Sequence, residues 1–297
     1  MPTERRTRPG PAAERTDVRK TYKLYVGGAF PRSESGRSYP VYDARGRLLA
    51  NASKASRKDL RDAVVAARKA VSGWSEATAY NRGQVLYRVA EMLEGRRAQF
   101  ESEVAGSERV TARRAARLVE QSIDRWVWYA GWTDKIAQIT GGANPVAGPY
   151  YDFTVPEPTG VVGVLAPQES ALLGLISVIA PVVAGGNTAV VICSQERPLP
   201  AITLGEVLAT SDLPGGVVNL LTGETAEMAP WLAGHMDVNA IDLTGAADGM
   251  RTELERAAAD NVKRIYRGRE SDWTADPGIG RLSAFLEHKT LWHPVGI

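Results

Sequence analysis

The sequence predicts an α/β fold built around a parallel β-sheet. Between Pro156 and Thr222, short β-branched runs alternate with helix-length segments at a spacing of roughly 27 residues. The runs 160–167 (GVVGVLAP) and 189–193 (AVVIC) are strand-like, and the apolar stretch 172–188 between them has the length of a helix. We expect strands near 161–165, 189–193, 217–221 and 239–243.

Composition limits the class of protein. A chain of 297 residues exceeds the size at which one core usually splits into two, and its 44% hydrophobic and 24% charged residues are ordinary for a globular protein. The net charge of +2 is too small to favour nucleic acid as a partner. The longest apolar run, Ala171 to Val183, is too short to span a membrane. Cys193 is the single cysteine, which fits a reducing cytoplasm.

Residues 1–20 form a basic segment with no apolar core behind it, so it lacks the pattern of a secretory signal. Acidic residues dilute its charge, and we interpret it as a disordered leader. The alternative is a basic tail that binds an acidic partner. The basic residues are Arg5, Arg6, Arg8, Arg15, Arg19 and Lys20.

Residues 21–140 are expected to form short strands followed by helices. Tyr22, Leu24 and Val26 alternate before a glycine pair, as in a short strand. Ser56 with Asp59 three residues later predicts a helix N-cap, and an apolar stripe with helical spacing follows. A second stripe follows in the 80s, and a longer helix is expected from about Thr111 to Ile136.

Several spaced motifs carry a family resemblance. They are Pro158-x-Gly160-Val161-Val162, Ala184-Gly185-Gly186-Asn187-Thr188 and Pro214-x-Gly216-Val217-Val218-Asn219. This pattern resembles the cofactor domain of the NAD(P)-dependent aldehyde dehydrogenases, over roughly residues 22–265 and 282–294. The resemblance implies a Rossmann-like sheet with an oligomerisation ribbon. The expected parts are the leader 1–20, a strand and helical part 21–140, a ribbon 141–157, a βαβ part 158–270, and a linker with a final ribbon strand 271–297.

The resemblance stops after Ile265. Family members continue there through a Glu-Leu-Gly-Gly turn into a catalytic domain, whereas this chain continues with YRGRESDWTADPGIGRL. The following stretch 285–297 (FLEHKTLWHPVGI) again resembles the family's last ribbon strand. We therefore expect an internal deletion that removes the catalytic domain and keeps both flanking parts.

The resemblance implies three groups for aldehyde oxidation: a cysteine thiolate, an amide that holds the oxyanion, and a carboxylate base. Cys193 lies in the cofactor domain, where it is expected to be a small buried side chain rather than a nucleophile. Glu169 stands where the family has its oxyanion asparagine, which inverts the electrostatics. No glutamate turn follows Ile265. We therefore expect no catalytic residue, and the three histidines lack metal-ligand spacing.

The cofactor positions implied by the resemblance are degenerate. The family's ribose-binding lysine and glutamate align with Ile192 and Gln195, and its pyrophosphate turn aligns with Gly245–Gly249 (GAADG). A helix N-terminus still offers N–H groups. We expect either no cofactor or weak NAD(P) binding. The vestigial cofactor-binding residues are Gln195, Pro214, Gly215, Gly245 and Ala246.

These observations lead to a functional hypothesis. The chain is expected to be a catalytically inactive aldehyde dehydrogenase homologue, a pseudoenzyme that acts as structural or regulatory partner of a full-length aldehyde dehydrogenase. Strand addition through the ribbon would give a hetero-oligomer, because a homodimer would leave strand edges unpaired. Two alternatives stay open: an NAD(P)-dependent aldehyde oxidoreductase and a nucleotide-sensing regulatory module.

Overall fold

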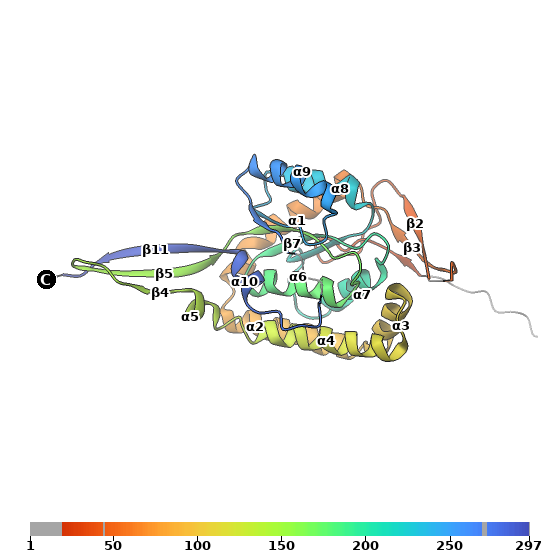
Figure 1. Cartoon of the computed structure of the whole chain (residues 1–297), viewed down its shortest axis with the longest axis horizontal. Coiled ribbons are helices and arrows are strands. Elements are labelled where there is room, and N and C mark those ends of the chain that lie inside the picture. Colours follow the sequence, from red (N-terminus) through yellow and green to blue (C-terminus); the bar gives the residue numbers. More distant parts are fainter. Residues whose placement is uncertain (1–19, 44, 269–271, 297) are drawn as a thin grey trace, which may run out of the picture.

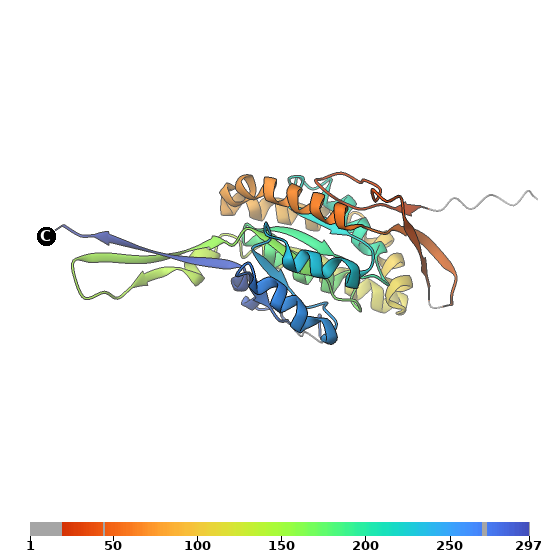
Figure 2. The ribbon, with the colours of Figure 1, turned by 90° about the horizontal axis from the view of Figure 1, so that it is seen from above.

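The computed structural model describes residues 20–43, 45–268 and 272–296. An α/β body carries a long ribbon at one end and a small mixed sheet at the other (Figure 1). Figure 2 shows the ribbon leaving the same end of the body when the molecule is seen from above. Residues 1–19, most of the expected leader, lie outside the described part.

The body is organised on a five-stranded parallel sheet with strand order β10-β9-β6-β7-β8. The four strands expected from the sequence are confirmed, and β10 adds a fifth that was not predicted. β10 is only three residues long, so its pattern is too short to read from the sequence. The bounds are β6 Val161–Leu165, β7 Thr188–Ile192, β8 Val218–Leu221, β9 Ala240–Asp242 and β10 Arg264–Tyr266.

Helices cover both faces of the sheet (Figure 1). One face is covered by α1 (Arg57–Glu76), α8 (Thr225–Gly234) and α9 (Asp248–Ala259). The other is covered by α6 (Leu173–Ala184) and α7 (Leu199–Leu208). Outside α6 lie α2 (Ala79–Glu94), α3 (Arg97–Glu108) and α4 (Ala112–Ala130). All 12 residues of α6 are buried, which explains why its sequence is apolar on every side.

Two helix boundaries predicted from the sequence can be compared with the structure. The Ser56–Asp59 capping box that begins α1 is confirmed. The prediction of one helix from Thr111 to Ile136 is wrong, because α4 ends at Ala130. Gly131 closes the helix and a turn follows, in which the Thr133 hydroxyl donates to the Ala130 carbonyl. A separate short helix, α5 (Ile136–Thr140), comes after the turn.

The ribbon is a three-stranded antiparallel sheet with order β11-β5-β4. The expected ribbon is confirmed, and β11 pairs with β5 over nine residues, from Leu286 opposite Pro158 to Pro294 opposite Tyr150. The strands are β4 (Gly142–Asn144), β5 (Tyr150–Pro158) and β11 (Leu286–Pro294). Residues 267–285, including the short helix α10 (Gly280–Ala284), connect β10 to β11.

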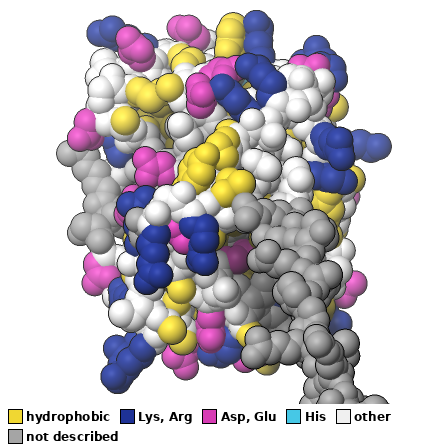
Figure 3. Space-filling view, turned by 90° about the vertical axis from the view of Figure 1, so that its right-hand side faces the viewer, with side chains coloured by type: hydrophobic (Ala, Val, Ile, Leu, Met, Phe, Trp, Pro, Cys, Tyr) yellow, Lys and Arg dark blue, Asp and Glu magenta, His cyan; other side chains and the backbone are white. Residues whose placement is uncertain are grey.

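The small sheet at the opposite end has strand order β1-β3-β2, from β1 (Thr21–Tyr22), β2 (Ser38–Tyr42) and β3 (Leu48–Ser53). Figure 3 looks at the end of the molecule away from the ribbon, where basic, acidic and hydrophobic side chains are interspersed. In the described part of the chain, none of the helices is long and apolar enough to cross a bilayer.

Candidate nucleotide-binding cleft

A cleft of about 400 Å³ lies at the carboxyl end of the parallel sheet. Residues that follow β6, β7, β8 and β9 meet there because the carboxyl ends of parallel strands share one edge. Ligands of open α/β sheets bind at this edge. The lining residues are Gln168, Glu169, Gln195, Thr225, Ala226, Thr244, Gly245, Ala246, Ala247 and Met250.

Three of the five expected cofactor-binding residues, Gln195, Gly245 and Ala246, line this cleft. Pro214 and Gly215 are not among the residues that line it. They precede β8, whose amino end lies at the opposite edge of the sheet. A side chain at Gly215 would come within 2.6 Å of the Gly27 carbonyl oxygen, so Gly215 serves a close approach of two backbone segments.

Sequence reasoning missed the residues that follow β8. Thr225 and Ala226 begin α8 and form one wall of the cleft. The Thr225 hydroxyl oxygen is buried without a hydrogen-bond partner in the described part of the chain. The signal that could have found them is Gly223, which has a positive φ of 143° in the turn between β8 and α8.

Gly245 builds the turn from β9 into α9. A Cβ at this position would lie 1.9 Å from the Ala166 carbonyl oxygen, so any larger residue would displace the backbone. The Gly245 N–H donates to Leu165 O at 2.8 Å, and the Ala246 N–H donates to Leu243 O at 3.0 Å. Both amides are therefore used within the fold. The helix α9 has no side-chain N-cap, so the N–H groups of its first turn are the ones left to face a ligand.

The charge of the cleft is a poor match for a dinucleotide. Among the described residues that line it there is no lysine or arginine, and Glu169 is the one ionisable side chain. The first turn of α9 adds Asp248, which is 94% exposed. A pyrophosphate carries negative charge and needs donors or cations. The cleft has the shape and position for a nucleotide, but its side chains do not fit the pyrophosphate of NAD(P).

Glu169 has a structural partner. Its carboxylate accepts a hydrogen bond from the Trp273 indole nitrogen at 3.2 Å, and its carbonyl oxygen accepts one from Arg197. Trp273 belongs to the connection between β10 and β11. Glu169, which was expected at an oxyanion position, therefore holds Trp273 of this connection.

Two buried arginines hold the same connection against the body. Arg281 pairs with Asp242 at the end of β9, and both side chains are at most 4% exposed. Arg125 from α4 donates to the carbonyl oxygens of Trp273 at 3.0 Å and Ala275 at 3.1 Å. Trp273 and Arg281 of the connection therefore lie at the carboxyl end of the sheet, beside the cleft.

Cys193 is fully buried after β7, and burial raises the pKa of its thiol to about 12. A thiol with this pKa is protonated at neutral pH and is a weak nucleophile. Among the described residues, no group of three or more histidine, cysteine, aspartate or glutamate side chains could hold a metal ion.

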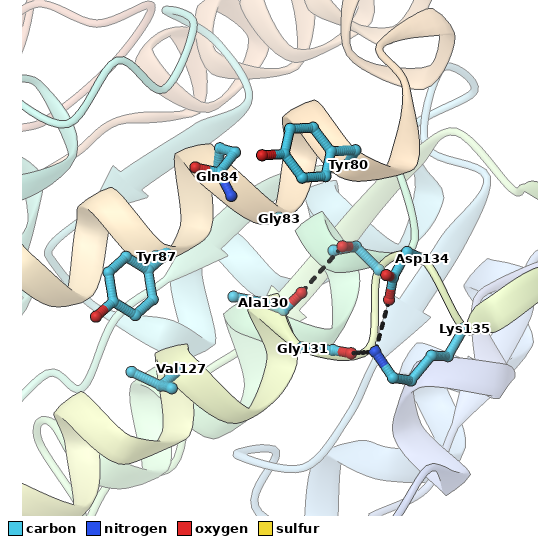
Figure 4. A pocket seen from close by; sticks show the side chains of 10 residues that line it. Tyr80, Gly83, Gln84, Tyr87, Val127, Ala130, Gly131, Asp134 and Lys135 are labelled. Atoms are coloured by element: carbon cyan, nitrogen blue, oxygen red, sulfur yellow. Dashed lines mark hydrogen bonds and ion pairs between the residues drawn. The ribbon is translucent and has the colours of Figure 1, made fainter.

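A second hollow of about 280 Å³ lies between α2 and the end of α4 (Figure 4). Tyr80, Gln84 and Tyr87 project from α2 on one side of it. On the other side the Lys135 ammonium group is bound to the Asp134 carboxylate at 2.7 Å and to the Gly131 carbonyl at 2.6 Å. The two charged side chains that line this hollow therefore neutralise each other.

An open parallel sheet with helices on both faces and a cleft at its carboxyl end defines a Rossmann-like, nucleotide-binding class of fold. The model of the aldehyde dehydrogenase family matches residues 30–267. This chain belongs to the aldehyde dehydrogenase family.

Similar proteins share this family. Retinal dehydrogenase 2 of Homo sapiens is 33% identical over 253 residues, which cover 83% of this chain and 48% of that protein. Cytosolic aldehyde dehydrogenase 1 of Elephantulus edwardii is 32% identical over 250 residues, 82% of this chain and 49% of the relative. The chain therefore spans about half the length of the curated relatives it matches.

Solved structures agree. HpcC from Thermus thermophilus superposes with a TM-score of 0.79 at 29% identity, over 83% of this chain and 47% of HpcC. The NAD+ complex of an aldehyde dehydrogenase from Bacillus cereus has a TM-score of 0.78 at 25% identity, over 83% of this chain and 50% of that one.

Proposed function

We propose that this chain is a catalytically inactive aldehyde dehydrogenase homologue that serves as a structural or regulatory partner of a full-length aldehyde dehydrogenase. The observation that carries the proposal is the projecting ribbon, in which β11 is an edge strand with eight of its nine residues exposed. A long exposed edge strand is a template for pairing with another chain. We therefore assign β11 as the docking strand for β-augmentation of the partner's sheet.

The hydrogen-bond register of the ribbon identifies the groups that are available on this edge. Thr159 N donates to Phe285 O at 3.2 Å, and Val295 N donates to Pro149 O at 2.8 Å, so the bonds to β5 fall on odd-numbered residues of the strand. The N–H groups of His288, Thr290 and Trp292 then point away from β5, toward the free edge. A partner strand would take these three donors.

Two features support inactivity. The chain's single cysteine is buried and has a raised pKa, and Glu169 occupies the expected oxyanion position while bonded to Trp273. Loss of one hydrogen-bond donor at such a position lowers the rate about 10²–10³-fold. A carboxylate there would in addition repel the negative charge that develops on the substrate oxygen. Assay of the pure chain for NADH formation from short aldehydes tests the alternative of an aldehyde oxidoreductase, and thiol-dependent turnover would establish that alternative.

The cleft supports a second candidate, a nucleotide-sensing module. It has the position and volume for a nucleotide, and the Thr225 hydroxyl is without a partner in the described part. We expect NAD and NADP to bind weakly or not at all, because no cation lines the cleft. Isothermal titration calorimetry with each cofactor measures this directly. Saturable binding at micromolar concentration would favour the sensing role over a pure structural one.

The partner role is tested by co-expressing the chain with a full-length aldehyde dehydrogenase from the same source and measuring the mass of the eluting species by light scattering. We expect one species that contains both chains. Two species that elute separately would contradict the proposal.

We also propose a cytoplasmic location, since the single reduced cysteine fits a reducing compartment.

A further inference from the structure

A groove lies on the outer surface of the body, between the first turns of α1 and the end of α8. Its volume is about 430 Å³, slightly larger than that of the candidate cleft. Arg57, Leu60 and Arg61 line one side, and Trp231, His235 and Met236 line the other. The groove shares no lining residue with the candidate cleft, and none of its lining residues belongs to the ribbon.

Large apolar side chains form much of this groove, and two of them are exposed to solvent. Trp231 is 45% exposed and Met236 is 69% exposed, while Leu60 beneath them is buried. Large apolar side chains that gather around an exposed concavity mark an interaction site. Tryptophan in particular contributes much of the binding energy at protein interfaces.

The charged side chains that line the groove are positive. The Arg57 guanidinium lies over the Trp231 ring, 3.5 Å from its centroid, and no carboxylate comes within ion-pair distance of it in the described part of the chain. Arg61 has one weak contact, at 3.5 Å to Asp62, which lies outside the groove. No acidic side chain is among the described residues that line the groove. Burial lowers the pKa of His235, so the positive charge comes from the two arginines.

We propose that this groove binds an acidic segment of a partner protein, in which a large apolar side chain is flanked by carboxylates. The apolar side chain would pack against Trp231 and Met236. The flanking carboxylates would pair with Arg57 and Arg61, whose planar guanidinium groups suit carboxylate recognition.

A protein segment fits better than an anionic membrane for two reasons. The site is concave and has room for one or two side chains, whereas a bilayer offers a broad, flat surface. Asp62 on the next turn of α1 is about half exposed, and Asp237 lies beyond His235. Both would face an anionic surface with charge of the same sign.

The experiment uses the full chain and a fluorescein-labelled peptide of alternating glutamate and phenylalanine, followed by fluorescence polarisation. We expect saturable binding that weakens with added salt. Arg57→Glu, Arg61→Glu and Trp231→Ala should each weaken the binding at least about tenfold. Glutamate is favourable in the first turn of a helix, where Arg57 lies, so Arg57→Glu should keep α1 folded. Arg113→Glu, at an exposed position on α4, is the matched control and should bind like the wild type.

Several results would overturn the inference. They are an absence of saturable binding, equal binding of a peptide with glutamine in place of glutamate, and binding that Arg57→Glu leaves unchanged. Binding to vesicles of anionic phospholipid that Arg57→Glu abolishes would assign the groove to a membrane instead. Self-association that Arg57→Glu abolishes would assign it to a second copy of this chain. Thr290→Pro in the ribbon should leave peptide binding unchanged, which keeps this test independent of the partner proposal.

Discussion

At the scale of single residues, Cys193 is the residue whose environment bears most directly on the chemistry. Its side chain is fully buried, and burial raises its pKa to about 12. We predict that 5,5′-dithiobis(2-nitrobenzoate) labels no thiol in the folded protein at neutral pH and about one thiol per chain in denaturant. Rapid labelling of the folded chain would contradict the assignment of Cys193 as a core residue.

Glu103 is a buried carboxyl on α3 that accepts hydrogen bonds from Tyr22 and Thr203, each at 2.9 Å. Its pKa is raised from the ordinary value of 4.5, chiefly by burial. Its folded pKa is higher than its unfolded pKa, so its contribution to stability is fully present below the unfolded value. That contribution is lost as the pH rises through the folded value.

We therefore predict that the free energy of unfolding of the wild type falls relative to that of Glu103→Gln as the pH is raised from about 4 to 7. Urea unfolding at a series of pH values measures the difference. Glu120→Gln, at an exposed position on α4, serves as the matched control. If the difference in free energy of unfolding between the wild type and Glu103→Gln does not change with pH, the Glu103 carboxyl has the same pKa in the folded and unfolded states.

At the scale of elements, the connection between β10 and β11 depends on the buried pair of Arg281 and Asp242. Removing one partner of a buried pair leaves an uncompensated charge and costs about 3–5 kcal/mol. We predict a loss of this size for Arg281→Met in urea unfolding. The double variant Arg281→Met with Asp242→Asn should lose less, because asparagine can still accept the Thr244 hydrogen bonds. Equal losses in the single and double variants would contradict the pair's role.

The outward N–H of Thr290 gives a second prediction at this scale. Thr290→Pro removes one donor from the free edge of β11 and leaves the pairing with β5 in place, since proline is tolerated at edge positions. We predict that this variant no longer assembles with a full-length aldehyde dehydrogenase. Both variants lose the hydrogen bond between the hydroxyl groups of Thr290 and Thr154. Thr290→Ala keeps the backbone N–H, so it should assemble like the wild type.

The elements also show what can be read from the sequence. The buried strands of the parallel sheet were predictable because they are short apolar runs at regular spacing, and the ribbon followed from the family resemblance. The end of α4 was placed too late because apolar residues continue past Gly131, where the chain turns. Pro214 and Gly215 were expected to bind the cofactor from the family resemblance. They precede β8, whereas the cleft lies where the strands of the sheet end.

The candidate site was less predictable than the fold. Gln195, Gly245 and Ala246 were expected from the family resemblance, and all three line the cleft. The contact of Trp273 with Glu169 joins residues 104 positions apart, and no local pattern encodes it. The groove of Trp231 and Arg57 likewise depends on how α8 packs against α1.

At the scale of the whole molecule, the body keeps a nucleotide-binding fold while its ribbon projects from one end (Figure 1). The chain matches about half the length of its relatives. The described part of the connection between β10 and β11 is held beside the cleft by contacts of Arg125, Trp273 and Arg281. The body thus has contacts at this edge of the sheet while β11 presents a free edge at the ribbon.

The most direct measurement of the partner role is the mass of the complex between this chain and a co-expressed full-length aldehyde dehydrogenase, determined by size-exclusion chromatography with light scattering. We predict a single hetero-oligomer for the wild type and for Thr290→Ala, and separate species for Thr290→Pro. A wild-type chain that elutes apart from the enzyme, or a Thr290→Pro chain that still elutes with it, would contradict docking through the free edge of β11.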